Sequence, residues 1–182
     1  MRAVRAALLV TFASMAVSAE DACQPLIPAT LQARLLKRYP SYRLPLQSDN
    51  YAEDIQRARD NSQSPCLGVA SADFDGDGQM DYVIALSAAK GGGAVVVVAL
   101  NRSSNWVIHP LDAMKEGRSR LYVSTGPAGP YTDVGDYDGP LKRGHVEEFN
   151  CPNPVAVFGT TEASGVAFCL LHSRWKHVWI AD

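Results

Sequence analysis

Apolar residues in the second part of the chain come in short runs that Gly, Asn, Ser and Pro clusters separate. Runs rich in valine, isoleucine and aromatic residues, bounded by such clusters, are typical of β-strands. The pattern predicts about eight strands, at residues 67–72, 82–86, 94–100, 106–111, 120–124, 155–159, 165–171 and 177–181. Because the turns are short, we expect the strands to pair antiparallel as a meander. Residues 95–98 are all valine, which indicates a strand that is buried on both faces.

The periodicity changes to that of a helix ahead of these strands. Leu31, Leu35, Leu36 and Tyr39 form one apolar stripe within residues 27–39, which Pro40 ends. Residues 50–60 predict a second, short helix. The expected fold is therefore mainly β (α+β), an antiparallel meander that is propeller-like or sandwich-like, with one or two N-terminal helices. We expect one domain at residues 20–182, with a helical segment at 27–60.

The first nineteen residues have the pattern of a secretory signal peptide. Arg2 and Arg5 precede an apolar run, and small residues end at Ala19 as at a cleavage site. The run is too short to span a bilayer, and no second long apolar stretch follows. We therefore expect residues 1–19 to be removed, and the protein to be periplasmic or secreted without a transmembrane segment.

Charge argues against a nucleic-acid partner. The chain has 17 basic and 19 acidic residues, and removal of two arginines leaves 15 − 19 = −4. No basic stripe is present to meet phosphates.

Four cysteines, Cys23, Cys66, Cys151 and Cys169, predict two disulfides in an exported protein. Three pairings are possible. We favour Cys151–Cys169, since the two flank an apparent hairpin, and this leaves Cys23–Cys66. A zinc site is disfavoured because no closely spaced cysteine pair exists and the histidines are scattered.

The most specific motif is the acidic stretch from residue 73 to residue 81, Asp-Phe-Asp-Gly-Asp-Gly-Gln-Met-Asp. Calcium takes about six to eight oxygen ligands, which a curled loop can supply from alternate positions. The predicted calcium ligands are the side chains of Asp73, Asp75, Asp77 and Asp81 and the backbone carbonyl of Gln79. Gly78 allows the sharp turn. The alternative is a solvated acidic turn between two strands, although four carboxylates repel one another without a cation.

An EF-hand is disfavoured. Its loop needs a bidentate Glu at position 12, where this chain has Ile84, and the flanking residues predict strands rather than helices. The stretch Ala72-Asp73-Phe74-Asp75-Gly76-Asp77-Gly78, followed by Met80-Asp81-Tyr82-Val83, instead resembles the FG-GAP/VCBS family of extracellular calcium-loop repeats. The resemblance implies the same calcium ligands on a β-hairpin. The family's propellers repeat the loop in several blades, whereas this chain has one copy.

The whole layout, from signal peptide to the last strand with Trp175 and Trp179, also resembles single-loop exported bacterial proteins. Some of these are periplasmic immunity proteins against peptidoglycan hydrolases, reminiscent of invertebrate-type lysozyme inhibitors. The resemblance implies a protein partner, a cell-wall hydrolase or toxin, and residues 124–131 as a loop that plugs its active site.

The irregular Gly- and Pro-rich segment 126–154 is the predicted partner surface, because long loops in compact domains are often functional. Its candidate contact residues are Tyr131, Tyr137, Lys142 and Arg143.

No catalytic set is recognisable, since the chain lacks G-x-S-x-G and H-E-x-x-H motifs. The sequence therefore predicts a non-enzymatic protein, and the whole-chain resemblance implies a calcium-binding inhibitor of a secreted peptidoglycan hydrolase. The alternative is a calcium-stabilised adhesion or carbohydrate-binding module, which would present exposed Trp106, Trp175 and Trp179.

Overall fold

The computed structural model describes residues 21–103, 105–135, 142–163 and 165–180. The predicted signal peptide and Tyr137 lie outside the described residues. Within the described residues, no helix has the length and apolar character that crossing a membrane requires.

The fold is mainly β, as predicted, with two α-helices near the start, α1 (Ala29–Arg38) and α2 (Ala52–Asp60). Each of the eight predicted strands is present; they are β2 (Val69–Ala72), β3 (Asp81–Ala88), β4 (Ala94–Arg102), β5 (Asn105–Met114), β6 (Leu121–Gly126), β9 (Val155–Thr160), β10 (Gly165–Leu171) and β11 (Arg174–Ile180). Three further strands were not predicted; they are β1 (Tyr42–Arg43), β7 (Gly129–Thr132) and β8 (Glu148–Cys151). Short 3₁₀-helices span Gln24–Leu26, Gln47–Asp49 and Arg118–Arg120.

The strands form two antiparallel sheets and a ribbon rather than one continuous meander. In the first sheet the order is β1-β3-β4-β5, and β2 also pairs with β3. The second sheet has the order β11-β10-β9-β6, and β7 pairs with β8 as a separate ribbon. The meander holds for β3-β4-β5 and for β9-β10-β11, but β6 leaves its chain neighbour β5 and joins β9.

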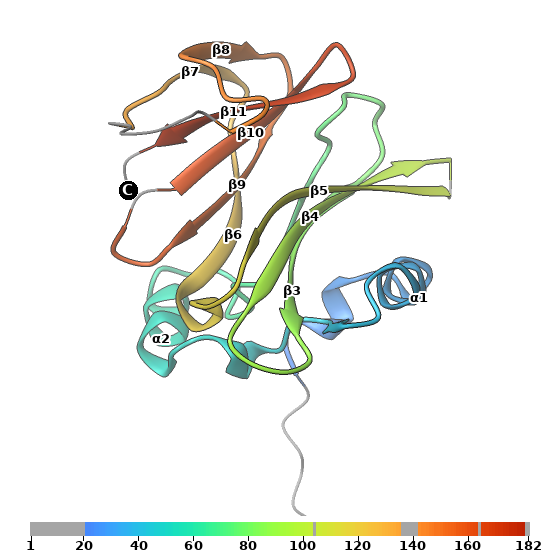
Figure 1. Ribbon diagram of the computed structural model, residues 1–182, viewed down its shortest axis with the longest axis vertical. Helices are drawn as coiled ribbons and strands as arrows, with labels where there is room; N and C mark the ends of the chain where they lie inside the picture. Colours follow the sequence, from blue (N-terminus) through green and yellow to red (C-terminus); the bar gives the residue numbers. More distant parts are fainter. Residues whose placement is uncertain (1–20, 104, 136–141, 164, 181–182) are drawn as a thin grey trace, which may run out of the picture.

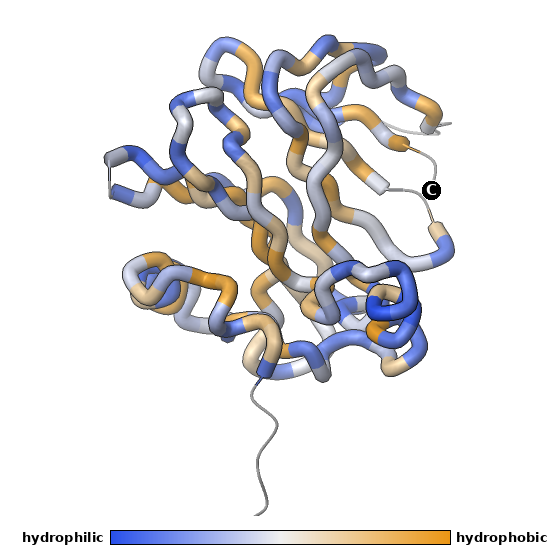
Figure 2. Tube along the Cα trace, turned by 180° about the vertical axis from the view of Figure 1, so that it is seen from behind, coloured by the Kyte–Doolittle hydropathy of each residue, from blue (hydrophilic) through white to orange (hydrophobic). Residues whose placement is uncertain are grey.

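These elements stack in layers, which Figure 1 shows from α1 through the two sheets to the β7–β8 ribbon. One core lies between α1 and the first sheet, and a second lies between the two sheets. A third core packs the second sheet against the ribbon. The sandwich-like alternative is therefore the one that the packed sheets form. Figure 2 shows apolar residues along the strands, whereas α2 is largely polar.

Strand β4 separates the first two cores. Val95 and Val97 pack in the core beneath α1, whereas Val96 and Val98 pack between the sheets. All four side chains are buried. This confirms the prediction of a strand with two apolar faces, because alternate side chains point to opposite sides of a sheet.

Helix α1 packs through Leu31 and Leu35, both fully buried. The predicted stripe was wrong at Leu36, which is 44% exposed. At its far side, Trp106 of β5 donates from Nε1 to the Thr30 hydroxyl over 3.1 Å. Arg34 donates to the Trp106 backbone carbonyl over 2.9 Å. Two hydrogen bonds, one to the backbone and one from the indole ring of the same residue, therefore join α1 to β5.

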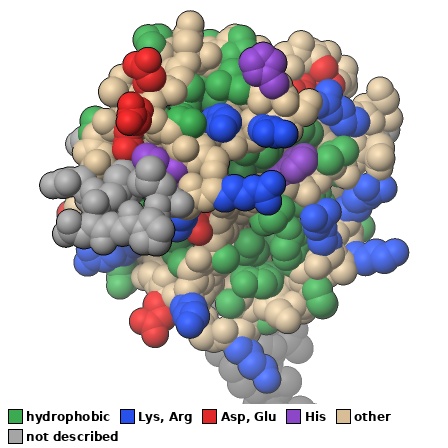
Figure 3. All heavy atoms as spheres, turned by 45° about the horizontal axis from the view of Figure 1, so that its top comes forward, with side chains coloured by type: hydrophobic (Ala, Val, Ile, Leu, Met, Phe, Trp, Pro, Cys, Tyr) green, Lys and Arg blue, Asp and Glu red, His purple; other side chains and the backbone are tan. Residues whose placement is uncertain are grey.

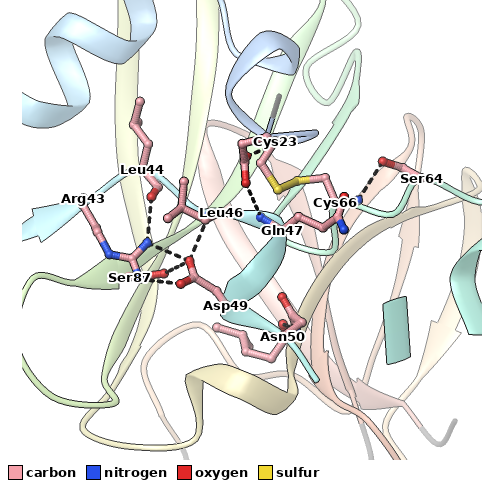
Figure 4. The surroundings of a disulfide bond; sticks show 12 residues. Cys23, Arg43, Leu44, Leu46, Gln47, Asp49, Asn50, Ser64, Cys66 and Ser87 are labelled. Carbon is pink, nitrogen blue, oxygen red and sulfur yellow. Dashed lines mark hydrogen bonds and ion pairs between the residues drawn. A yellow bond between two sulfur atoms is a disulfide. The ribbon is translucent and has the colours of Figure 1, made fainter. Parts of the chain in front are cut away.

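Both favoured disulfides are present, Cys23–Cys66 and Cys151–Cys169. The first joins the start of the described chain to the segment that enters β2 (Figure 4). The second joins β8 of the ribbon to β10 of the second sheet. The second bond therefore fixes the ribbon to a sheet, whereas the first joins two segments that precede β2.

Candidate metal centre and candidate partner surface

The acidic stretch is the loop of a β-hairpin, as its flanks predict. Ala72 of β2 pairs with Asp81 of β3, so residues 73–80 form the connection. Gly76 and Gly78 have positive φ values of 75° and 81°, which side-chain-bearing residues rarely adopt. The turn at Gly78 therefore has the left-handed backbone that the sequence predicts.

Three carboxylates of this loop converge. Ligand oxygens of Asp73, Asp75 and Asp81 lie within 4.8 Å of one another. This is the acidic cluster, and it brings together three of the four predicted side-chain ligands. Oxygen donors at this separation can hold a metal ion.

Asp81 lies at the base of the acidic cluster and is fully buried. Its Oδ2 accepts a hydrogen bond from the Phe74 N–H over 2.9 Å, and its Oδ1 accepts one from the Asn101 N–H over 2.8 Å. Burial raises the pKa of Asp81 to about 6 despite these bonds, and the charges of Asp75 and Asp77 act in the same direction. A buried carboxylate of this kind gains from a cation beside it.

Asp73 shapes the loop backbone. Its Oδ1 accepts hydrogen bonds from the N–H groups of Gly76 over 2.7 Å and of Asp77 over 3.1 Å. Its Oδ2 accepts one from the Gly78 N–H over 2.8 Å. Three donors on one carboxylate curl the chain around it, so the loop is ordered by its own residues.

Asp75 contributes a side chain that is only 3% exposed. Its Oδ2 lies 2.8 Å from Nη2 of Arg102 at the end of β4, an ion pair whose geometry is not that of an aligned hydrogen bond. Burial raises the pKa of Asp75, while the Arg102 charge opposes the shift. Arg102 is a charged neighbour of the acidic cluster that the sequence did not predict.

The other two predicted ligands are placed differently. The Asp77 carboxylate lies outside the acidic cluster; its Oδ1 accepts from the Gln79 N–H over 2.8 Å, and its Oδ2 is 3.7 Å from Arg102 Nη1. Gln79 is exposed. Their roles as calcium ligands stay predictions.

Two residues anchor the loop to the second sheet. Phe74, 1% exposed, lies in the core between the sheets, with its ring 6.5 Å from that of Trp175 in an edge-on contact. Asn153, between β8 and β9, lies against Gly76, where a Cβ would approach it to 2.8 Å. Phe74 is the one aromatic residue of the acidic stretch, which is the sequence signal for its burial, whereas Asn153 is remote in sequence.

The predicted partner residues that the structure describes lie in two places, Tyr131 in strand β7 and Lys142 and Arg143 in the connection between β7 and β8. Tyr131 of β7 is half-buried, packs on Phe149 of β8 and donates to the Pro127 carbonyl over 2.9 Å. Lys142 and Arg143 are exposed and line a hollow of about 40 Å³. Lys142 also lies 2.7 Å from the Asp112 carboxylate. Figure 3, with the top of Figure 1 brought forward, shows a face on which Lys, Arg and His side chains lie among apolar ones.

The aromatic face that a carbohydrate-binding module would need does not form from the three tryptophans. Trp106 is 7% exposed and packs in the core beneath α1. Trp175 and Trp179 are partly buried against the core between the sheets. Trp106 therefore packs on the α1 side of the first sheet, whereas Trp175 and Trp179 of the second sheet pack on its other side.

No family model, no curated protein and no solved structure matches this chain. The geometry of the loop and the surfaces of the fold therefore carry the functional argument.

Proposed function

We propose that this chain is an exported protein that binds one calcium ion at the β2–β3 hairpin loop. The observation that carries the proposal is the fully buried Asp81 carboxylate within 4.8 Å of the Asp73 and Asp75 oxygens. Calcium prefers clustered carboxylate oxygens and tolerates irregular geometry, so the chemistry of this donor set fits it.

The role proposed for calcium is structural. The loop connects β2 to β3, its Phe74 is buried between the sheets, and Asp81 accepts from Asn101 at the end of β4. An ion held by Asp73, Asp75 and Asp81 would tie these elements together at one end of the sandwich. Calcium supplies positive charge there, and the acidic residues hold it.

Calorimetric titration of the metal-free protein with calcium tests this proposal, with Asp75→Ala as the matched variant. We expect binding by the wild type and none by the variant. At about 100 times its dissociation constant, calcium should add roughly 2.7 kcal/mol to the free energy of unfolding. Equal melting temperatures of wild type and variant, with and without chelator, would reject the site.

We further propose that the protein acts without catalysis, by binding and inhibiting a secreted peptidoglycan hydrolase, as the whole-chain resemblance implies. The observation that favours this is the β7–β8 ribbon, which lies within the predicted partner segment. The Cys151–Cys169 bond holds it to the second sheet, and Tyr131 packs on Phe149 within it. A braced ribbon loses little conformational entropy when a partner binds.

A lysis assay with purified hydrolases tests the inhibitor proposal. We expect the protein to slow lysis of peptidoglycan by its partner, and Arg143→Glu to weaken this effect while the melting temperature stays unchanged. Retention on glycan resin without binding to any hydrolase would instead favour the adhesion or carbohydrate-binding alternative.

A further inference from the structure

A short segment lies across the edge of the sandwich, between β5 of the first sheet and β11 of the second. We name it the strap and define it as residues 142–146. Lys142 of the strap lies 2.7 Å from the Asp112 carboxylate of β5. The hollow that Lys142 and Arg143 line takes its other walls from β5, β10 and β11. The strap therefore contacts both sheets and covers part of the core between them.

Backbone hydrogen bonds hold the strap to the outer edge of β11. The His177 N–H donates to the Gly144 carbonyl over 3.0 Å, and the Val146 N–H donates to the His177 carbonyl over 3.1 Å. Gly144 has a φ of 94°, and a Cβ there would come within 2.8 Å of the Trp175 carbonyl. The strap thus lies tightly against β11, and its two backbone bonds meet at His177.

The side chain of His177 is buried where these bonds meet. The residue is 6% exposed, and its ring stacks on that of Phe168 with the centroids 4.9 Å apart. The ring of His145, a strap residue whose side chain is 4% exposed, lies 5.5 Å from that of His177. Two buried imidazoles therefore face one another between the strap and β11.

The surroundings of His177 favour its neutral form. Its charged and titratable neighbours are Lys142, Arg143 and His145 of the strap, Asp112 of β5, and Asp133 after β7. Burial lowers the pKa of His177, the charges of His145 and Lys142 act in the same direction, and those of Asp112 and Asp133 oppose it. Asp112 lies against Lys142, and Asp133 Oδ2 lies 3.0 Å from His145 Nε2. A proton on His177 thus adds positive charge to a buried site whose carboxylates are already engaged.

We propose that acid releases the strap from β11, and that His177 is the group that takes up the proton. Release breaks the two backbone bonds at His177 and lets water reach the imidazolium. The trigger and the segment that moves are both separate from the acidic cluster. The proposal does not depend on calcium binding or on hydrolase inhibition.

The direction of the effect follows from the burial of His177. A histidine whose pKa is lowered in the closed form binds its proton more readily in the open form. The closed form therefore loses stability as the pH falls below about 6.5, the ordinary pKa of an imidazole, and is unaffected well above it. Each pKa unit between the two forms shifts the equilibrium toward the open form by up to about tenfold.

Asp133 is not the trigger. Burial alone would raise the pKa of Asp133, but the Trp179 N–H, which donates to Oδ1 over 2.7 Å, and His145 outweigh burial and lower it. This carboxylate therefore stays charged between neutral pH and about pH 5. The Val134 N–H also donates to the Trp179 carbonyl over 3.1 Å, so the segment after β7 stays on β11 when the strap leaves.

Hydrogen exchange at about pH 7.5 and about pH 5 tests the proposal. Protection factors are compared, because they remove the pH dependence of the chemical exchange step. We expect the amides of Val146 and His177 to lose protection about tenfold, while Val97 of the central strand β4 stays within about twofold. His177→Gln should abolish this loss. His109→Gln is the matched control, since His109 is another partly buried histidine, 6.3 Å from the Trp175 ring, and the loss should persist in it.

A titration of the imidazole resonances of the wild type is the second measurement. It keeps the proposal testable if His177→Gln does not fold. We expect His177 to titrate at a lower pH than the exposed His172. Equal midpoints would overturn the proposal, as would full protection of Val146 at pH 5 or a loss that His177→Gln retains. Equal losses at Val146 and Val97 would mean global unfolding and would overturn it too, as would a loss that His109→Gln also abolishes.

Discussion

Arg102 at the end of β4 places its Nη2 2.8 Å from Oδ2 of Asp75 in the acidic cluster. The guanidinium therefore supplies positive charge to carboxylates that would otherwise repel one another. Its Nη1 lies 3.7 Å from the Asp77 carboxylate as well. Calcium and Arg102 thus act on the same negative charge, and we expect the ion to bind against the repulsion of the guanidinium.

Arg102→Gln should therefore raise the affinity for calcium several-fold, because it removes a like charge next to the ion. The same change should lower the melting temperature of the metal-free protein, since the acidic cluster then lacks a counter-charge. Calorimetry and thermal unfolding with chelator measure the two effects. Arg59→Gln on the exposed side of α2 is the control, and an equal change in both variants would contradict the role of Arg102.

Asp75 and Asp77 should differ as calcium ligands. Asp75 belongs to the acidic cluster and its side chain is 3% exposed, whereas the Asp77 side chain is 28% exposed and lies outside the cluster. We expect Asp75→Asn to weaken calcium binding at least tenfold and Asp77→Asn only a few-fold. Titrations of both variants decide this, and equal losses would show that the ion draws Asp77 into its coordination shell.

The loop could be predicted from the sequence because its interactions are local. Asp73 binds the backbone of Gly76, Asp77 and Gly78, all within five residues. The contacts that place the loop in the fold are not local. Asn101, Arg102 and Asn153 approach from other strands and turns, and no pattern within the loop specifies them.

The β7–β8 ribbon could not be predicted for a different reason. Its residues sit among prolines and glycines, and each strand is only four residues long. Gly129, Pro130 and Asn150 are poor strand formers, so local propensity argued against pairing. The ribbon is held by tertiary contacts instead, with Phe149 and Cys151 buried against the second sheet.

A further prediction concerns Asp49, which links three parts of the chain. Its carboxylate pairs with Arg43, accepts from the Leu46 N–H over 2.9 Å and from the Ser87 hydroxyl over 2.6 Å, and lies 3.6 Å from buried Arg118 (Figure 4 shows the first three). Burial alone would raise the pKa of Asp49, but Arg43 and these other groups outweigh burial and lower the pKa.

A carboxyl group with a lowered folded-state pKa stabilises the protein above its unfolded pKa of about 3.9 and loses this effect as the pH falls below that value. Asp49→Asn should therefore cost about 3–5 kcal/mol near neutral pH, since it leaves buried Arg118 without its counter-charge. The difference from wild type should shrink below about pH 4. Urea unfolding across this range measures it, and a difference independent of pH would exclude the ionised form as the cause.

The packing of α1 gives a matched pair of variants. Leu35 is fully buried, whereas the adjacent Leu36 is 44% exposed. Leu35→Ala should reduce the free energy of unfolding by about 2–5 kcal/mol through lost burial and a cavity. Leu36→Ala should change it by less than about 0.5 kcal/mol. Similar losses in the two variants would mean that α1 is rotated relative to the sheet.

The last prediction separates the two disulfides by the elements that they hold. Cys151–Cys169 closes a sequence separation of 18 residues and joins the ribbon to β10, so replacing both cysteines with alanine should cost roughly 3 kcal/mol. Hydrogen exchange should then speed up in β7 and β8 before it does in β9 or β10, because the ribbon loses its covalent link to the second sheet. Replacing Cys23 and Cys66 instead should destabilise the start of the chain and leave ribbon exchange unchanged. Equal exchange of ribbon and sheet after loss of Cys151–Cys169 would show that Phe149 packing alone holds the ribbon, and would remove the argument for a braced partner surface.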